Sequence, residues 1–390
     1  MASNILPEPP SDLKRHSKKL SGCIRSSMQQ NGHIPFSQFM EMALYEPGLG
    51  YYSAGLHKLG RSGDFITSPE LGSLFAACLA VQAEEIGGGL GEYTVLEVGA
   101  GTGRLAADFL NQVDPGKAPS RYMILERSGD LKRVQKETIK KDAPAWMDRV
   151  VWLDRPPEED WRGVLIANEV IDALAVERFR ISGEGVQQLC VKTSQSGFEW
   201  AAQAAPPELV AAVRHLEADT GTVFAEDYRS EIQLQLSAWL HSLTENLVSG
   251  LALFIDYGYP RSEFYLPERS DGTLMCHYRH QAHDDPFFWP GLQDITAWVD
   301  FTALAEAADN CGLEVEGYTS QSMFLIGCGL ERILQEKMKH SDDDGMALNN
   351  EIRQLTMPGM MGERFQVMGL GRNLDREPTG FSLRDLRFRL

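Results

Sequence analysis

The sequence predicts an α/β protein built on a mostly parallel β-sheet, and two observations support this fold class. Short apolar runs typical of buried strands recur along the chain, at 95–98, 121–126, 163–167 and 251–255. Helical patterns separate these runs, so strand and helix alternate as they do in open α/β sheets. We expect further core strands at 149–153, 313–318 and 365–368.

Composition excludes several classes of function. The chain has 390 residues and a formal net charge of −18, so it lacks the basic surface that nucleic-acid binding requires. No apolar run has the length of a membrane span, and the N-terminus lacks the apolar core of a secretory signal. Six cysteines without a C-x-x-C pair indicate reduced thiols. We therefore expect a cytoplasmic protein, or a mitochondrial matrix protein if the chain is eukaryotic; the sequence indicates no oligomeric state.

A glycine-rich turn follows the first core strand. Gly99, Gly101 and Gly103 let the backbone turn tightly and approach a ligand closely, and a helical pattern begins directly after them. This arrangement favours a nucleoside-type cofactor at the carboxyl end of the strand. A dinucleotide fold needs glycine or alanine at the position that Arg104 occupies here. The pattern E-V-G-x-G-x-G, which begins at Glu97, instead resembles motif I of the Rossmann-like S-adenosylmethionine-dependent methyltransferases.

Two later positions are further candidates for cofactor binding. Glu126 is the last residue of the expected second strand, about twenty residues after the turn, where an acid accepts hydrogen bonds from ribose hydroxyls. The alternative for this residue is an ordinary solvent-facing acid at a strand end. In the fold that motif I implies, residues after the third strand usually meet the adenine, so Leu153 is a candidate there.

Two longer motifs precede the first core strand. P-G-x-G-Y-Y starts at Pro47, and G-D-F-x-T-S-P-E starts at Gly63. Ser68 can cap a helix, which explains the end of the second motif but not its beginning. In this order, the motifs resemble the MidA family of S-adenosylmethionine-dependent methyltransferases, which includes a mitochondrial complex I assembly factor. The resemblance implies that Asp64 and Thr67 line the site for the amino-acid end of S-adenosylmethionine.

The resemblance covers about residues 35–372 and implies a domain organisation. It predicts a Rossmann-like methyltransferase sheet whose last strand is antiparallel, within a core of residues 91–390. Residues 1–90 are expected to form an N-terminal helical cap and a loop that covers the cofactor. Strand-like runs between glycine turns predict a small antiparallel meander inside an α+β insertion at about 177–245, and a second insertion spans about 258–300.

Polar residues at the ends of two strands form the candidate acceptor site. Methyl transfer requires a positioned acceptor, and an arginine guanidinium needs carboxylates that orient and polarise it. Asn168, Glu169 and Asp172 follow the fourth strand, in a stretch that resembles the family's A-N-E-x-x-D-A-L-P-V. Alanine replaces the proline of that pattern at Ala175. We expect catalytic roles for Asn168, Glu169 and Asp172, and the alternative for Asp172 is that it caps the next helix. Asp256, in I-D-Y-G-Y, is a further substrate-side candidate.

The loop at 272–287 is dense in polar and aromatic residues. Cys276, His277, His280 and His283 raise a zinc hypothesis, because nitrogen and sulfur ligands at short spacing can form a tetrahedral site. However, Cys276 and His277 are adjacent, and the histidine spacing matches no known ligand pattern. The sequence therefore predicts no metal. His280 and His283 are instead candidates on the substrate side, where either could accept a departing proton.

These patterns together predict an enzyme that uses S-adenosyl-L-methionine to methylate a protein. The MidA resemblance implies arginine as the acceptor and a respiratory complex I subunit as the partner. One alternative is a small-molecule O- or N-methyltransferase, whose acceptor would sit in a closed pocket. Another is a non-catalytic, cofactor-binding assembly factor, which the intact glycine turn and Glu126 disfavour. Arg104 disfavours a dehydrogenase.

Overall fold

The computed structural model describes residues 6–55, 67–340 and 345–390, which cluster into two compact units. Unit 1 comprises Met1–Phe65, Asp172–Gln235 and Arg261–Trp298. Unit 2 comprises Ile66–Ile171, Leu236–Pro260 and Val299–Leu390. This grouping differs from the domain division expected at residue 90, because residues 66–90 cluster with the later core. The two expected insertions cluster largely with the N-terminal residues.

Unit 2 is built on one large sheet. Its strands lie in the order β15 (Glu314–Ser320), β16 (Phe365–Arg372), β10 (Leu247–Tyr259), β5 (Trp161–Asn168), β2 (Thr94–Val98), β3 (Arg121–Leu125) and β4 (Val150–Leu153). The strands from β10 to β4 are parallel to their neighbours. The last strand, β16, is antiparallel to both β10 and β15. The short β14 (Val299–Asp300) pairs with the end of β10. The mostly parallel sheet with an antiparallel last strand is therefore confirmed.

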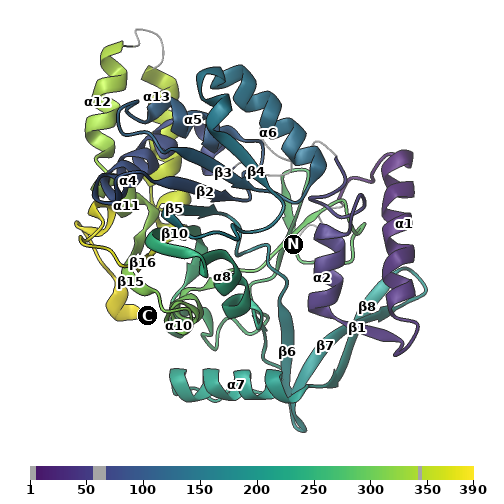
Figure 1. The fold of residues 1–390 in the computed structure, drawn as a ribbon. Helices are drawn as coiled ribbons and strands as arrows, with labels where there is room; N and C mark the ends of the chain where they lie inside the picture. The colour runs from purple at the N-terminus through teal and green to yellow at the C-terminus, as the bar shows by residue number, and fades with distance from the viewer. Residues whose placement is uncertain (1–5, 56–66, 341–344) are drawn as a thin grey trace. The chain divides into compact units, whose positions relative to one another are not determined.

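Helices pack on both faces of this sheet. Alternate residues of β10 show the two faces, because successive strand side chains point to opposite sides. Leu253 joins a core cluster with Phe75 of α4 (Leu74–Leu90) and Leu105 of α5 (Arg104–Gln112). On the opposite face, Phe254 packs against Trp239 of α8 (Leu236–Thr244), with ring centroids 6.0 Å apart. The sheet is thus buried from both sides (Figure 1), which explains its apolar strands.

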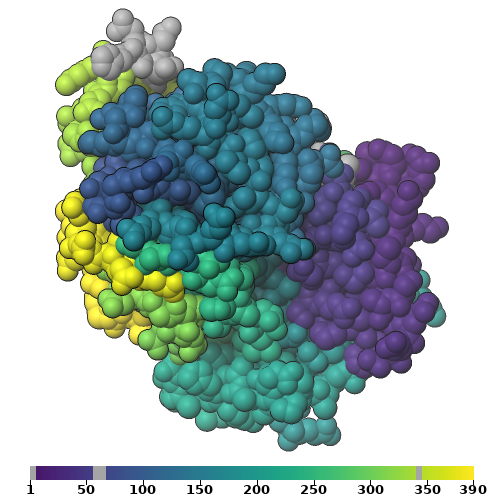
Figure 2. Space-filling view, viewed as in Figure 1, coloured from purple at the N-terminus to yellow at the C-terminus, as the bar shows by residue number. Residues whose placement is uncertain are grey.

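The remaining helices of unit 2 follow or connect the strands. They are α3 (Ser68–Leu71), α6 (Gly129–Asp142), α10 (Phe301–Asn310), α11 (Gln321–Gly327), α12 (Leu330–His340), α13 (Gly345–Thr356) and α14 (Met361–Arg364), with 3-10 helices η1 (Pro144–Arg149), η2 (Thr379–Phe381) and η3 (Arg387–Arg389). Lys337 of α12 donates to Ser73 Oγ at 2.9 Å and to Gln112 Oε1 at 3.0 Å. The yellow-green α12 accordingly adjoins the blue atoms of α4 and α5 (Figure 2).

Unit 1 contains an antiparallel sheet in the order β1 (His33–Pro35), β7 (Gly185–Thr193), β6 (Glu177–Ser182) and β9 (Arg229–Ile232), with β8 (Phe198–Ala204) also paired to β7. The meander expected in the insertion is therefore present. Helix α2 (Phe36–Tyr45) packs on it through Phe39, whose ring lies 5.6 Å from that of Phe198. Unit 1 also contains α1 (Ser11–Ser27), α7 (Pro207–Thr220) and α9 (Arg261–Phe264).

A smaller sheet in unit 1 carries part of the loop singled out above. Its order is β12 (Gln281–His283), β11 (Met275–Tyr278) and β13 (Asp294–Thr296), and both pairings are antiparallel. No helix in the described part of the chain combines the length and the apolar character that a membrane crossing requires.

Candidate cofactor and acceptor site

The glycine turn follows β2 near the middle of the unit 2 sheet. Gly99, Gly101 and Gly103 have φ angles of +70°, +50° and +81°, a region that favours glycine. A Cβ added at Gly103 would lie 2.9 Å from the Cα of Gln135, so even alanine would collide with backbone there. Gly103 is the residue directly before α5. The predicted sequence of strand, tight turn and helix N-terminus is present.

Gln135 of α6 connects the parts of this region, and sequence reasoning missed it. Its side-chain amide donates to the Gly101 carbonyl at 3.1 Å and to Glu126 Oε2 at 3.0 Å. Its Oε1 accepts from the Trp152 indole at 3.0 Å. The Gln135 side chain is fully buried. A glutamine inside a polar helical stretch gives little signal in the sequence; the one hint is that the apolar Ile139, four residues later, lies on the same helix face, and both residues are buried.

Glu126 directly follows β3 and lies beside the turn. Its backbone N–H donates to the Leu153 carbonyl at 3.1 Å, which links the end of β3 to the end of β4. Its Oε1 accepts from the Ser128 N–H at 2.8 Å. Burial raises the pKa of the Glu126 carboxyl, while the bonds from Ser128 and Gln135 lower it in part. Leu153 itself is half-buried at the end of β4.

Glu97 occupies a different environment from the turn that follows it. It lies within β2 and is buried, and its Oε2 accepts a hydrogen bond from the Tyr122 hydroxyl at 2.8 Å. Burial raises the pKa of Glu97 to about 7, and the nearby charge of Glu126 also raises it. The structure thus pairs this acid with the neighbouring strand, and its expected role in cofactor binding stays a prediction.

The acceptor candidates of unit 2 lie at the end of β5. Asn168 is its last residue, and Glu169 has a φ of +53°, which is uncommon for a residue with a side chain. The Glu169 N–H donates to the Ile255 carbonyl at 2.9 Å. Its Oε1 accepts from Asn168 Nδ2 at 3.0 Å and from the Ser68 N–H at 3.4 Å. Residues held in such conformations cluster at functional sites.

Asp256 of β10 holds the backbone of this loop. Its Oδ2 accepts from the N–H groups of Val170 at 3.2 Å and Ile171 at 3.0 Å. Its Oδ1 accepts from the Tyr257 N–H at 2.9 Å, and the side chain is buried. These bonds give the carboxylate a structural function, and the substrate-side role expected from the sequence stays a prediction.

Of the two residues of the G-D-F-x-T-S-P-E motif expected to bind the cofactor, the structure describes only Thr67. Asp64 lies outside the described residues. Thr67 is half-buried and directly precedes α3, which begins at Ser68. The expectation that Ser68 caps the helix is wrong by one residue, because Thr67 occupies the cap position, no side chain caps the helix, and the Ser68 hydroxyl donates to Gln321 instead. The contacts of α3 arise from residues distant in the chain.

The remaining candidates belong to unit 1. Asp172 is buried, and its carbonyl accepts from the Ala297 N–H at 2.9 Å. His280 is exposed and has a φ of +61° in the turn between β11 and β12. His283 pairs with Cys276 across these strands, and burial lowers the pKa of its imidazole. His280 therefore lies in the turn, whereas His283 is the last residue of β12. Among residues with described positions, no group of three potential ligands is placed to hold a metal.

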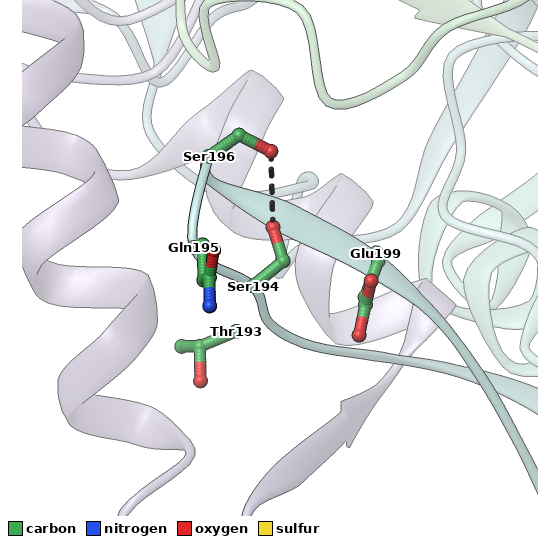
Figure 3. A pocket seen from close by; sticks show the side chains of 5 residues that line it. All are labelled: Thr193, Ser194, Gln195, Ser196 and Glu199. Carbon is green, nitrogen blue, oxygen red and sulfur yellow. Dashed lines mark hydrogen bonds between the residues drawn. The ribbon is translucent and has the colours of Figure 1, made fainter.

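A shallow polar hollow lies at the tip of the β7–β8 hairpin, lined by Thr193, Ser194, Gln195, Ser196 and Glu199 (Figure 3). The hydroxyls of Ser194 and Ser196 are 3.4 Å apart, and Glu199 forms an ion pair of 3.2 Å with Lys192. None of the predicted site residues lines this hollow. Its lining is that of an ordinary hairpin turn.

A family of S-adenosyl-L-methionine-dependent methyltransferases matches residues 74–319 of this chain. The chain belongs to this family. A Burkholderia thailandensis protein whose crystal structure contains S-adenosyl-homocysteine is 38% identical and superposes with a TM-score of 0.92, covering 99% of this chain and 100% of that chain. The family predicted from the motifs is confirmed, and the cofactor of this methyltransferase is S-adenosyl-L-methionine.

Curated relatives are more distant in sequence but similar in length. The mitochondrial protein arginine methyltransferase NDUFAF7 homologue of Drosophila melanogaster is 26% identical, over 96% of this chain and 93% of the relative. The mitochondrial protein arginine methyltransferase NDUFAF7 of Homo sapiens is 26% identical, over 88% of this chain and 81% of the relative.

The residues around the glycine turn fit this cofactor. The positive φ angles of the three glycines bend the backbone tightly at the carboxyl end of β2, which is where open α/β sheets bind their ligands. Each carboxylate oxygen of Glu126 accepts one bond described above, and such an oxygen has two acceptor sites. The acid can therefore accept further bonds from hydroxyl groups.

Proposed function

We propose that this methyltransferase methylates arginine side chains of a protein. The observation that supports the proposal most directly is the position of Glu169, which places a carboxylate directly after β5 in a conformation with φ of +53°. A carboxylate suits a guanidinium because paired N–H···O bonds supply both orientation and charge match. The names of the curated relatives, protein arginine methyltransferases, support the same acceptor.

Glu169 orients the acceptor nitrogen, and Asn168 orients Glu169 through the bond of 3.0 Å between them. Bound S-adenosyl-L-methionine supplies an electrophilic methyl group on its sulfonium. Because the guanidinium is always protonated in water, its nitrogen must lose one proton when the N–C bond forms and the S–C bond breaks to release S-adenosyl-homocysteine. The Glu169 carboxylate, hydrogen-bonded to this nitrogen, accepts that proton and passes it to water. Asp172 follows three residues later in the chain, and we assign it a supporting role.

On the cofactor side, we assign the turn at 99–103 to the amino-acid end and sugar of the cofactor. Glu126 accepts hydrogen bonds from the ribose hydroxyls, and Leu153 contacts the adenine. The assignments of the turn, Glu126 and Leu153 follow from strand ends in an open α/β sheet, where ligands bind beyond the carboxyl ends. The MidA resemblance supports a role for Asp64 and Thr67 at the amino-acid end of the cofactor.

The protein acceptor we propose is a subunit of a respiratory complex of the complex I type. The MidA resemblance and the NDUFAF7 relatives support this partner. The formal net charge of −18 favours a cationic acceptor segment, such as one that presents arginine. The cytoplasm is the expected compartment in a bacterium, and the mitochondrial matrix in a eukaryote.

Methylation of a host proteome tests the proposal. Protein extract from a host strain lacking the protein is incubated with isotope-labelled S-adenosyl-L-methionine and the purified enzyme, and labelled peptides are identified by mass spectrometry. We expect label on arginine in one or a few proteins, and none with Glu169→Ala. Glu159→Ala, at an exposed position before β5, serves as the matched control and is expected to behave as wild type.

The alternatives give different results in the same experiment. A small-molecule methyltransferase would label the low-molecular-mass fraction and leave protein arginine unlabelled. A non-catalytic assembly factor would bind S-adenosyl-homocysteine in calorimetry but label neither fraction. Label on a residue type other than arginine would overturn the arginine assignment and leave the methyltransferase activity in place.

A further inference from the structure

Helix α3 contacts the glycine turn through one side chain. Glu70 Oε1 accepts a hydrogen bond from the Thr102 hydroxyl at 2.5 Å. Thr102 lies between Gly101 and Gly103, so this bond reaches the centre of the turn. Both partners belong to unit 2 and are partly buried, which limits competition from water.

The first residue of α3 contacts the acceptor side. The Ser68 N–H donates to Glu169 Oε1 at 3.4 Å, the same oxygen that accepts from Asn168. Ser68 is fully buried. Two residues of one short helix therefore contact the two loops that follow β2 and β5.

Buried polar contacts fix α3 from its other side. Ser68 Oγ donates to Gln321 Oε1 of α11 at 3.2 Å, and the Gln321 amide donates to the Leu355 carbonyl of α13 at 3.2 Å. Just after α3, the Leu74 N–H donates to Glu351 of α13 at 2.6 Å. These contacts make α3 a fixed support for the residues that it touches.

We propose that Glu70 is a positioning residue for S-adenosyl-L-methionine binding. The three glycines leave the turn many accessible conformations, and glycine loses more freedom than any other residue when its backbone is fixed. Accepting the Thr102 hydroxyl restricts the turn to one shape before the cofactor arrives. Pre-organisation of this kind increases affinity by reducing the entropy lost on binding. Glu70 acts through Thr102 and does not itself contact the cofactor.

A double-mutant cycle tests this relationship with S-adenosyl-homocysteine as the probe and calorimetry as the measurement. Glu70→Ala and Thr102→Val should each weaken binding about tenfold, the low end for a hydrogen bond to a charged group. The double variant should bind no more than about twofold more weakly than either single variant, because each change removes the same bond. Glu70→Gln and Thr102→Ser keep an acceptor and a hydroxyl, so both should bind within about threefold of wild type.

Two results would overturn the proposal. One is additive losses in the double variant, which indicate that Glu70 and Thr102 act separately. The other is wild-type affinity in Thr102→Val, which is nearly isosteric and keeps the test valid even if Glu70→Ala folds poorly. Thermal unfolding without ligand identifies loss of folding, and Glu159→Ala is the control for removal of an acid elsewhere in unit 2. The test needs no methyl acceptor, so its outcome is independent of the arginine proposal.

Discussion

The Tyr122 hydroxyl donates a hydrogen bond to Glu97 at 2.8 Å, and both side chains are buried in neighbouring strands of the sheet. Burial favours the neutral form of the Glu97 carboxyl and raises its pKa to about 7, although the bond from Tyr122 lowers the pKa in part. A protonated carboxyl at this position therefore suits the folded state better than a charged one.

Replacing Glu97 with glutamine should change how stability depends on pH. The ordinary pKa of 4.5 applies to the unfolded chain, and the folded value is about 7, so the contribution of this group is full below pH 4.5. As the pH rises through about 7, the contribution of Glu97 to the free energy of unfolding is lost, and this loss amounts to at most about 3 kcal/mol. Glu97→Gln stays neutral and should lack this loss. Urea unfolding at several pH values between about 5 and 8 measures it, and parallel curves for the two proteins would contradict the prediction.

Gly103→Ala should disrupt the cofactor turn. The φ of +81° disfavours a side chain, and the new Cβ would lie 2.9 Å from the backbone of Gln135. We expect a loss of about 2 kcal/mol or more in unfolding free energy, and weaker binding of S-adenosyl-homocysteine. Gly129→Ala is the matched control, because nothing lies within 4 Å of a Cβ there and its φ is outside the positive range. Equal effects of the two substitutions would refute the structural reason given.

Gln135→Leu should destabilise unit 2 beyond the loss of one bond. It leaves the indole N–H of the half-buried Trp152 without the acceptor described above and removes one donor from the buried Glu126. Leaving buried polar groups unpaired costs about 1–3 kcal/mol each, so we expect about 2–4 kcal/mol in chemical denaturation. Glu137→Leu, on an exposed position of the same helix, should cost less than about 1 kcal/mol. An unchanged free energy of unfolding in Gln135→Leu would show that water replaces these contacts.

Glu169→Gln should separate catalysis from cofactor binding. The amide keeps an oxygen that can accept from Asn168 and Ser68 but removes the charge that we propose orients the guanidinium. We expect methylation to fall about 100-fold, while the affinity for S-adenosyl-homocysteine stays within about threefold. Labelled-methyl transfer and calorimetry give the two values. Unchanged methylation would remove Glu169 from the acceptor site.

Much of the fold could be predicted because its signals are local. Apolar runs and the glycine turn depend on residues close together in the chain, and the strands expected at 95–98 and 121–126 are each present to within one residue. The N–H contacts of Asp256 could not be predicted, because an acid at a strand end has the same pattern whether it meets a substrate or a loop. Gln135 and Glu70 were missed since their partners lie many residues away.

The position of β16 between β10 and β15 has a consequence for synthesis of the chain. Leu253 of β10 pairs with Gly369 of β16, so this edge of β10 stays open until more than a hundred further residues have been translated. An open edge of an apolar strand is a template for wrong pairing. We expect the nascent chain to depend on chaperones between translation of β10 and β16, and C-terminal truncations before residue 365 to aggregate.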